Sequence, residues 1–197
     1  MNRLKFEIRR KLLHLVLGSS ILLGFHYEIL DSLMLFGIIL CGVITSIIEK
    51  ERKLPIVSKM LDLFERPEFR TRFPGKGTIF FVFGALLAIQ LFERDIALAS
   101  IAVLTFSDAV TPIIGIYYNE KKNREKKFIV ASVFGMCIGF LAARIFINPL
   151  YALFAAAGGT AADFFEFEIN KSDVDDNILV PLAAGTAILL LRRFLGL

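Results

Sequence analysis

The chain has 197 residues, of which 56% are hydrophobic, and its mean hydropathy of +0.66 is far above that of a soluble domain. These values exclude an ordinary water-soluble globular protein and indicate an integral membrane protein. The net charge of +4 does not predict nucleic acid binding, because basic residues between apolar segments report membrane orientation. No segment resembles an independent soluble core, so we expect one membrane domain over residues 1–197.

Seven apolar runs lie between clusters of charged residues, and each approaches the roughly 20 residues that cross a bilayer. They predict an all-α bundle of about seven transmembrane helices. In chain order the runs cover residues 12–30, 32–48, 77–92, 96–118, 128–147, 149–168 and 178–195. Between the second and third runs, residues 55–64 carry a helical apolar stripe that is too short to span the bilayer. We expect this segment to form an amphipathic helix in the membrane interface.

The distribution of basic residues predicts the orientation of the bundle. Nineteen of the 23 lysines and arginines lie in residues 1–11, 49–76, 119–127 and 171. If the chain crosses the membrane seven times, all four of these segments lie on the same side. Positive residues favour the cytoplasmic side. The N-terminus is therefore expected in the cytoplasm, with the C-terminus on the opposite side of a cell membrane.

Asp108 lies inside the fourth apolar run, in the segment FSDAVTPIIG. A carboxylate at that depth costs roughly 2.5 to 3.5 kcal/mol and usually has a function, although hydrogen bonds from neighbouring hydroxyls for helix packing are the alternative. Pro112 follows one turn later and frees a backbone carbonyl near Asp108, which is tolerated where a helix lines a cavity. We therefore interpret Asp108 as a candidate site residue.

Two further acidic positions lie near the expected cytoplasmic ends of helices. Asp163 follows the small-residue segment AAAGGTAA, which allows a helix to pack closely on a neighbour. Asp176 and Asn177 stand directly before the last apolar run, where such residues also cap helices. Oxygen ligands of this kind suit Mg²⁺. Asp108, Asp163 and Asp176 are thus candidates for catalytic or metal-binding carboxylates, with Asn177 as an additional metal ligand.

Two groups of basic and polar residues could bind phosphate. The segment RTRFPGKGT places Arg72 and Lys76 around a Pro-Gly turn that leads into a helix, an arrangement typical of anion sites, although a positive-inside anchor has the same composition. On the first helix Lys11 and His14 share one side with Glu7 and Gly18, because their spacings are four, three and four residues. We expect that side to form either a polar wall or a packing surface.

These segments, taken in order, resemble the membrane family that contains dolichol kinases, CTP-dependent diacylglycerol kinases and phytol kinases. The resemblance rests on EIRRKLLHLVLG, FPGKGTIFF, FSDAVTPIIG and DDNILVPLAAG, and covers nearly the whole chain. From the resemblance we expect glutamate where Asp163 stands, and the shorter aspartate could still bind a metal. Relatives also have a K-S-x-E-G-S-like segment where this chain keeps Lys127 and Ser132 but has Val130 and Ala131.

The resemblance implies a CTP-dependent lipid-alcohol kinase that transfers the γ-phosphoryl group of CTP, with Mg²⁺, to a hydroxyl at the cytoplasmic face. The acceptor would be a polyprenol or a diacyl or diether glycerol. Asp108, Asp163 and Asp176 would be catalytic and, with Asn177, would bind the metal. The nucleotide and its phosphates would be bound by Lys11, His14, Arg72, Lys76, Thr78 and Lys127.

Two other functions remain open at this point. A CTP-dependent cytidylyltransferase that makes a CDP-lipid needs the same nucleotide, metal and membrane geometry, and only its product differs. An ion or proton-coupled transporter also uses carboxylates inside the membrane. Transporters often contain internal repeats, and this sequence shows none that is convincing.

Overall fold

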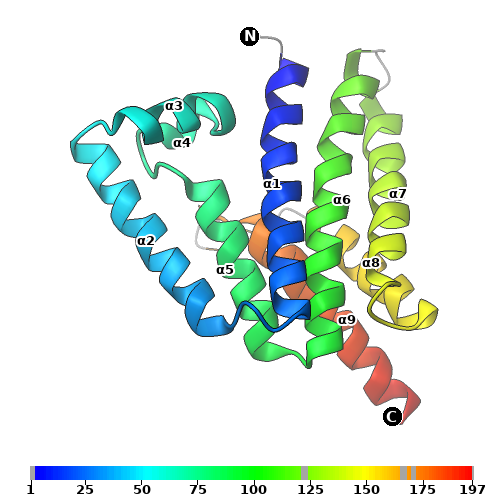
Figure 1. The fold of residues 1–197 in the computed structure, drawn as a ribbon. Helices are drawn as coiled ribbons and strands as arrows, with labels where there is room; N and C mark the ends of the chain where they lie inside the picture. Colours follow the sequence, from blue (N-terminus) through cyan, green and yellow to red (C-terminus); the bar gives the residue numbers. More distant parts are fainter. Residues whose placement is uncertain (1–2, 121–123, 165–167, 170–171, 197) are drawn as a thin grey trace.

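The structure is a computed structural model that describes residues 3–120, 124–164, 168–169 and 172–196. The described chain is helical apart from one short hairpin, as the sequence predicts (Figure 1). The helices are α1 (Arg3–His26), α2 (Ser32–Glu51), α3 (Pro55–Phe64), α4 (Pro67–Arg70), α5 (Lys76–Leu91), α6 (Arg94–Glu120), α7 (Arg124–Ala143), α8 (Pro149–Phe164) and α9 (Asp176–Leu195). Strands β1 (Glu168–Ile169) and β2 (Ser172–Asp173) pair antiparallel between α8 and α9.

Local chemistry fixes several helix ends. Pro55, Pro67 and Pro149 are the first residues of α3, α4 and α8, where the missing amide hydrogen of proline costs nothing. Asp31 caps α2, because its side chain accepts a hydrogen bond of 2.7 Å from the Met34 amide. These residues explain why the helices begin where the apolar runs suggest.

The seven predicted apolar runs all form helices, with shifted ends. α1 begins at Arg3, well before residue 12, so its charged first turns belong to the helix. The sixth run was predicted to continue to residue 168, but α8 ends at Phe164 and the chain then enters the hairpin. Helix α4 and the hairpin were not predicted. The amphipathic segment 55–64 is helix α3, as expected.

Three of the described helices are long and apolar enough to cross a membrane, which supports a helical membrane protein. They are α2, residues 94–117 of α6, and α9. Helix α5 and residues 129–143 of α7 are apolar but shorter. The number of spans and the side on which the N-terminus lies stay predictions.

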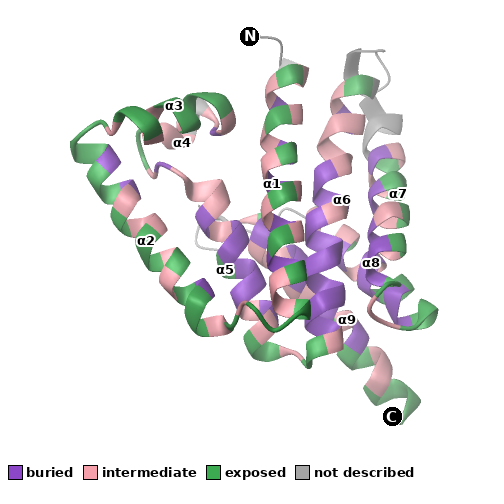
Figure 2. Ribbon diagram, viewed as in Figure 1, coloured by how far each residue is buried: buried purple, intermediate pink, exposed green. Residues whose placement is uncertain are grey.

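Helix α6 is the centre of the bundle and contacts α1, α5, α7, α8 and α9. Each residue from Ile96 to Thr105 is at most 4% exposed. Figure 2 shows this continuous buried segment, while the other long helices present exposed residues along one side. A residue on α6 is thus placed to meet side chains from several helices.

The outer surface of the bundle is apolar. Exposed side chains include Val16 on α1, Leu33 on α2, and Phe194 on α9, which are 65%, 75% and 87% exposed. Helix α2 packs on α5 and otherwise leans away from the bundle, with most of its surface exposed (Figures 1 and 2). Such a surface would be unfavourable in water, but suits contact with lipid chains.

In the upper half of the bundle as drawn, some helices end while others continue. Figure 1 shows that α1, α6 and α7 extend well beyond the N-terminal ends of α5 and α9 and the C-terminal end of α8. The N-terminal ends of α5 and α9 and the C-terminal end of α8 therefore lie beside the middle of α1, α6 and α7. Polar groups at helix ends can reach side chains of α1 and α6 there.

Candidate functional site

A buried ion pair joins α1 to α6. Lys11 Nζ lies 2.5 Å from Asp108 Oδ1, and the residues are 1% and 6% exposed. His14, 2% exposed, places its Nδ1 3.6 Å from the other carboxylate oxygen of Asp108. The packing alternative for Asp108, hydrogen bonds from nearby hydroxyls on its own helix, is not what the structure shows. Its partners come instead from α1.

The polar side of α1 is buried, as its spacing predicts. Glu7, Lys11, His14 and Gly18 are all buried in the bundle. A Cβ added to Gly18 would lie 2.3 Å from the hydroxyl of Thr105 on α6, so glycine is required for α1 and α6 to approach this closely. The close contact brings Lys11 and His14 within reach of Asp108.

Helix α6 continues through Pro112 and ends only at Glu120. Proline at this position cannot donate a hydrogen bond to the carbonyl of Asp108, four residues earlier. One residue further toward the N-terminus, the Ser107 carbonyl accepts a 3.0 Å hydrogen bond from the Thr111 hydroxyl. Pro112 thus leaves the Asp108 carbonyl without its helical amide donor, as expected, although the helix is not broken.

The two other predicted carboxylates approach Asp108 from different helices. Asp163, on the last turn of α8, and Asp176, on the first turn of α9, each interact electrostatically with Asp108 and with Lys11. Asp176 also interacts with Asp163. Asp163 is half-buried and Asp176 is exposed, unlike Asp108. The fold therefore brings the three aspartates, predicted from separate motifs, into one region.

Lys76 begins α5 directly after Gly75, which has φ +78° and so needs glycine. Its Nζ lies 3.2 Å from Asp175, the N-cap residue of α9. The same ammonium group lies over the rings of Phe69 and Phe80, 4.8 and 5.2 Å from their centroids. These contacts hold one cation between the N-terminal ends of α5 and α9, where helix dipoles also favour anions.

Glu65 is a buried residue of this region that sequence reasoning missed. It is the C-cap residue of α3, is 8% exposed, and its carboxylate interacts with the Gly77 amide on α5. Burial raises the pKa of Glu65, and the nearby cations Arg10 and Arg66 oppose this only in part. The sequence does not indicate the contact between Glu65 and Gly77, because α4 and a turn separate the two residues along the chain.

Asn177 is held tightly on the first turn of α9. Its Nδ2 donates a 2.7 Å hydrogen bond to Asp175, and a Cβ added to Gly84 of α5 would lie 2.0 Å from its backbone oxygen. The side-chain oxygen, Oδ1, is buried without a hydrogen-bond partner among the described residues. A buried carbonyl oxygen with no donor fits a cation or a ligand donor.

The predicted Mg²⁺ ligands fit that ion in the kind of donor. The accessible carboxylate of Asp176 and the unpaired Oδ1 of Asn177 would supply two oxygens, and Mg²⁺ usually takes few protein ligands beside phosphate and water. Asp108 is already paired with Lys11. Within the described part of the chain, no group of three or more His, Cys, Asp or Glu side chains is arranged to hold a metal. Metal binding by all four residues stays a prediction.

The remaining predicted phosphate ligands lie around the same end of α5 or outside the described side chains. Arg72 is exposed in the turn before α5, and Thr78 is half-buried on its first turn. Lys127 belongs to α7, but its side chain is outside the described residues. Among the described side chains of Arg72, Lys76 and Thr78, Lys76 has an ion-pair partner in the site, Asp175.

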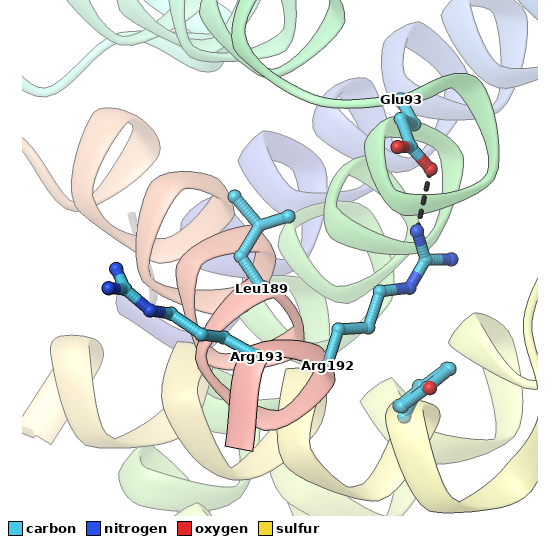
Figure 3. A pocket seen from close by; sticks show the side chains of 5 residues that line it. Glu93, Leu189, Arg192 and Arg193 are labelled. Atoms are coloured by element: carbon cyan, nitrogen blue, oxygen red, sulfur yellow. Dashed lines mark hydrogen bonds and ion pairs between the residues drawn. The ribbon is translucent and has the colours of Figure 1, made fainter. Parts of the chain in front are cut away.

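A second polar region lies at the opposite end of the bundle. Glu93, Tyr151, Leu189, Arg192 and Arg193 line an open depression there, of about 570 Å³. Figure 3 shows Arg192 reaching Glu93, 2.6 Å away, while Arg193 points to the other side of α9. Arg192 also pairs with Asp95 at 2.8 Å and stacks over Tyr151. These contacts tie the end of α9 to the start of α6.

Comparison with known proteins shows a similarity to an archaeal protein. The chain is similar to the uncharacterized protein MJ1137 of Methanocaldococcus jannaschii, with 29% identity over 187 residues that cover 92% of each chain. No family model matches the chain, and no solved structure matches it. The similarity extends over nearly the full length of both proteins.

Proposed function

We propose that the protein is a lipid-alcohol kinase of the membrane, which transfers the γ-phosphoryl group of CTP to a hydroxyl. One observation carries the proposal: a buried Lys11–Asp108–His14 cluster lies inside a bundle with an apolar surface, beside the N-terminal ends of α5 and α9. Fixed cations and helix N-termini are what phosphoryl transfer requires, since the protein's work is positioning and charge stabilisation. The apolar surface suits a bundle that lies in the bilayer, where a lipid acceptor is found.

The reaction assigns distinct tasks to the residues of the site. The acceptor hydroxyl oxygen bonds to the γ-phosphorus, the bond from that phosphorus to the β,γ-bridging oxygen breaks, and CDP leaves. Lys76, with Arg72 at the entrance, would bind the phosphates, and Mg²⁺ bound near Asp176 and Asn177 would neutralise their charge. The hydroxyl proton would pass to a carboxylate, and among the described residues Asp163 is in no ion pair that would compete for it.

Asp108 acts in this proposal through its neighbours. Lys11 binds one of its oxygens and His14 lies nearest to the other, so the carboxylate fixes the position of both side chains. Lys11 and His14 would then face the nucleotide phosphates or the lipid hydroxyl. Removing the charge of Asp108 should release both.

We further propose that the N-terminus and the site face the cytoplasm of a cell membrane. The described basic residues within 3–11, 49–76 and 124–127 lie toward the end of the bundle where α1 begins (Figure 1). In a background without Cys41 and Cys137, a membrane-impermeant thiol reagent applied outside intact cells should label Phe194→Cys and spare Lys5→Cys. The reverse pattern would contradict the orientation.

The test of function is product analysis with purified protein in lipid nanodiscs, Mg²⁺ and CTP labelled at the γ-phosphate, using polyprenol and diacylglycerol as acceptors. A kinase moves the label into the lipid phase, and Asp108→Asn should abolish the transfer. Asp95→Asn is the matched control, because it makes the same change at the far end of α6. Label released in pyrophosphate would identify a cytidylyltransferase, and no turnover with either acceptor would refute the kinase and leave the transporter.

A further inference from the structure

Three buried side-chain atoms lack a hydrogen-bond partner in the part of the chain that the structure describes. They are His14 Nδ1, Thr160 Oγ1 and Asn177 Oδ1. Buried polar atoms in folded proteins are almost always paired, and an unpaired one destabilises the fold unless a ligand or water binds it. His14 and Asn177 are only 2% and 5% exposed, so bulk solvent does not reach most of either side chain.

The three atoms belong to three helices that surround Asp108. His14 on α1 lies 3.6 Å from Asp108. Asn177 on α9 follows Asp176, which interacts with Asp108. Thr160 lies one helical turn before Asp163, hence on the same face of α8, and Asp163 also interacts with Asp108. His14 Nδ1 already lies within ion-pair distance of Asp108. The two unpaired oxygen atoms, of Thr160 and Asn177, lie on helices whose aspartates interact with Asp108, and they indicate a site for a polar ligand.

Thr160 lies on a different side of this region from the cation Lys76. Ala156, one turn before Thr160 on the same face, would lie 3.7 Å from a Cβ on Gly139 of α7, and the same Cβ would lie 3.3 Å from Ser107 of α6. This face of α8 therefore turns toward α6 and α7. Lys76, in contrast, lies between α5 and α9. The residues of α6 that lie near this face at Gly139, which are Val103 and Ser107, carry no charge. The cation that interacts with Asp163, one turn further along α8, is Lys11, which already pairs with Asp108.

We propose that Thr160 is a positioning residue that binds the hydroxyl of the lipid acceptor. The inference rests on the proposed kinase function and divides its site in two: phosphates on the Lys76 side, and the alcohol on the Thr160 side. A threonine hydroxyl both donates and accepts, which matches an alcohol, whereas phosphate binding calls for cations. Asp163, on the same face of α8, then lies next to the hydroxyl whose proton must be removed.

Kinetics of Thr160→Val test the proposal, because valine keeps the shape of threonine and removes the hydroxyl. The KM for the lipid alcohol should rise about tenfold, equivalent to about 1.4 kcal/mol of binding, while the KM for CTP stays within twofold. Thr160→Ser restores the hydroxyl and should restore the KM. Thr105→Val is the matched control, since the Thr105 hydroxyl is buried but already bound to the Ile101 carbonyl at 2.7 Å. Equal changes in both KM values would overturn the proposal.

A binding measurement separates this proposal from the kinase itself. Diazirine-bearing polyprenol and diacylglycerol are photo-crosslinked to the protein in nanodiscs without nucleotide, and the labelled peptides are mapped. Labelling of α8 by at least one probe should fall about tenfold in Thr160→Val and recover in Thr160→Ser. If labelling follows Thr160 but CTP is not turned over, the proposed reaction is wrong and the alcohol site stands. If labelling ignores Thr160, the site is refuted; Thr160→Ala replaces a valine variant that does not fold.

Discussion

Lys11→Met is expected to lower the free energy of unfolding by about 3–5 kcal/mol. Lys11 and Asp108 lie 2.5 Å apart, and their side chains are only 1% and 7% exposed. Methionine keeps most of the length and volume of the lysine stem, so little packing is lost. The cost arises because the Asp108 carboxylate stays buried without its counter-ion.

The double variant Lys11→Met/Asp108→Leu isolates the pair. Replacement of both partners of a buried ion pair by apolar residues is often neutral or stabilising, so the double variant should lie within about 1–2 kcal/mol of wild type. The coupling energy of the double-mutant cycle should then exceed about 2 kcal/mol. Activity should be lost in the single and the double variants alike, because the double variant regains stability but not the charged groups of the site.

Reversible unfolding in mixed micelles, followed by far-ultraviolet circular dichroism, measures these free energies. Arg94→Met is the control: Arg94 pairs with Glu28 at 2.6 Å, but the two side chains are 49% and 74% exposed. Loss of such a surface pair costs about 1 kcal/mol or less. If Lys11→Met costs no more than Arg94→Met, or if the two single changes are additive, the pair is not the buried, coupled element described above.

Two further predictions concern the contact of α5 with α9 and the buried carboxylate of Glu65, which lies near the start of α5. Gly84→Ala should destabilise the protein by about 1–3 kcal/mol and reduce activity, because the new Cβ would lie 2.0 Å from the Asn177 carbonyl; Gly37→Ala, with nothing within 4 Å, should be neutral or slightly stabilising in the same unfolding assay. Equal effects of the two changes would argue against the contact between α5 and α9. Because burial raises the pKa of Glu65 above its ordinary 4.5, the native state holds that proton more tightly than the unfolded state, so the free energy of unfolding should fall as pH rises from about 4.5. Glu65→Gln should remove this decline, and parallel pH profiles of variant and wild type would contradict it.

Helix positions could be predicted from the sequence because apolar runs bounded by charges define them directly. All seven runs are helices, and the short amphipathic segment is α3. The ends were less predictable where charged residues continue a helix: α1 begins at Arg3 because its first turns pack polar side chains against the bundle. The hairpin after α8 escaped prediction because the pairing of Glu168 with Asp173 leaves no apolar pattern in so short a segment.

The composition of the site was predictable only in part. The spacing of Glu7, Lys11 and His14 correctly indicates one buried side of α1, since helical periodicity is a local property. The pairing of Lys11 with Asp108 joins positions 97 residues apart and follows from the packing of α1 on α6. Thr160 gave no signal, because a threonine among alanines and glycines reads as packing until its hydroxyl is found buried and unpaired.

The net charge of the side chains around Asp108 determines which charged ligands the site can bind. Asp108, Asp163, Asp175 and Asp176 face two lysines, Lys11 and Lys76, so the fully ionised set carries a formal charge of −2. One divalent cation neutralises that charge, whereas free CTP would add further negative charge to a region of low dielectric. The proposed kinase should therefore bind CTP tightly only with Mg²⁺. Isothermal titration calorimetry of CTP with and without EDTA measures this dependence. Asp176→Asn removes one negative charge and should make CTP binding less dependent on Mg²⁺. Equally tight binding of CTP without a divalent cation would show that the carboxylates do not form the metal-dependent half of the site.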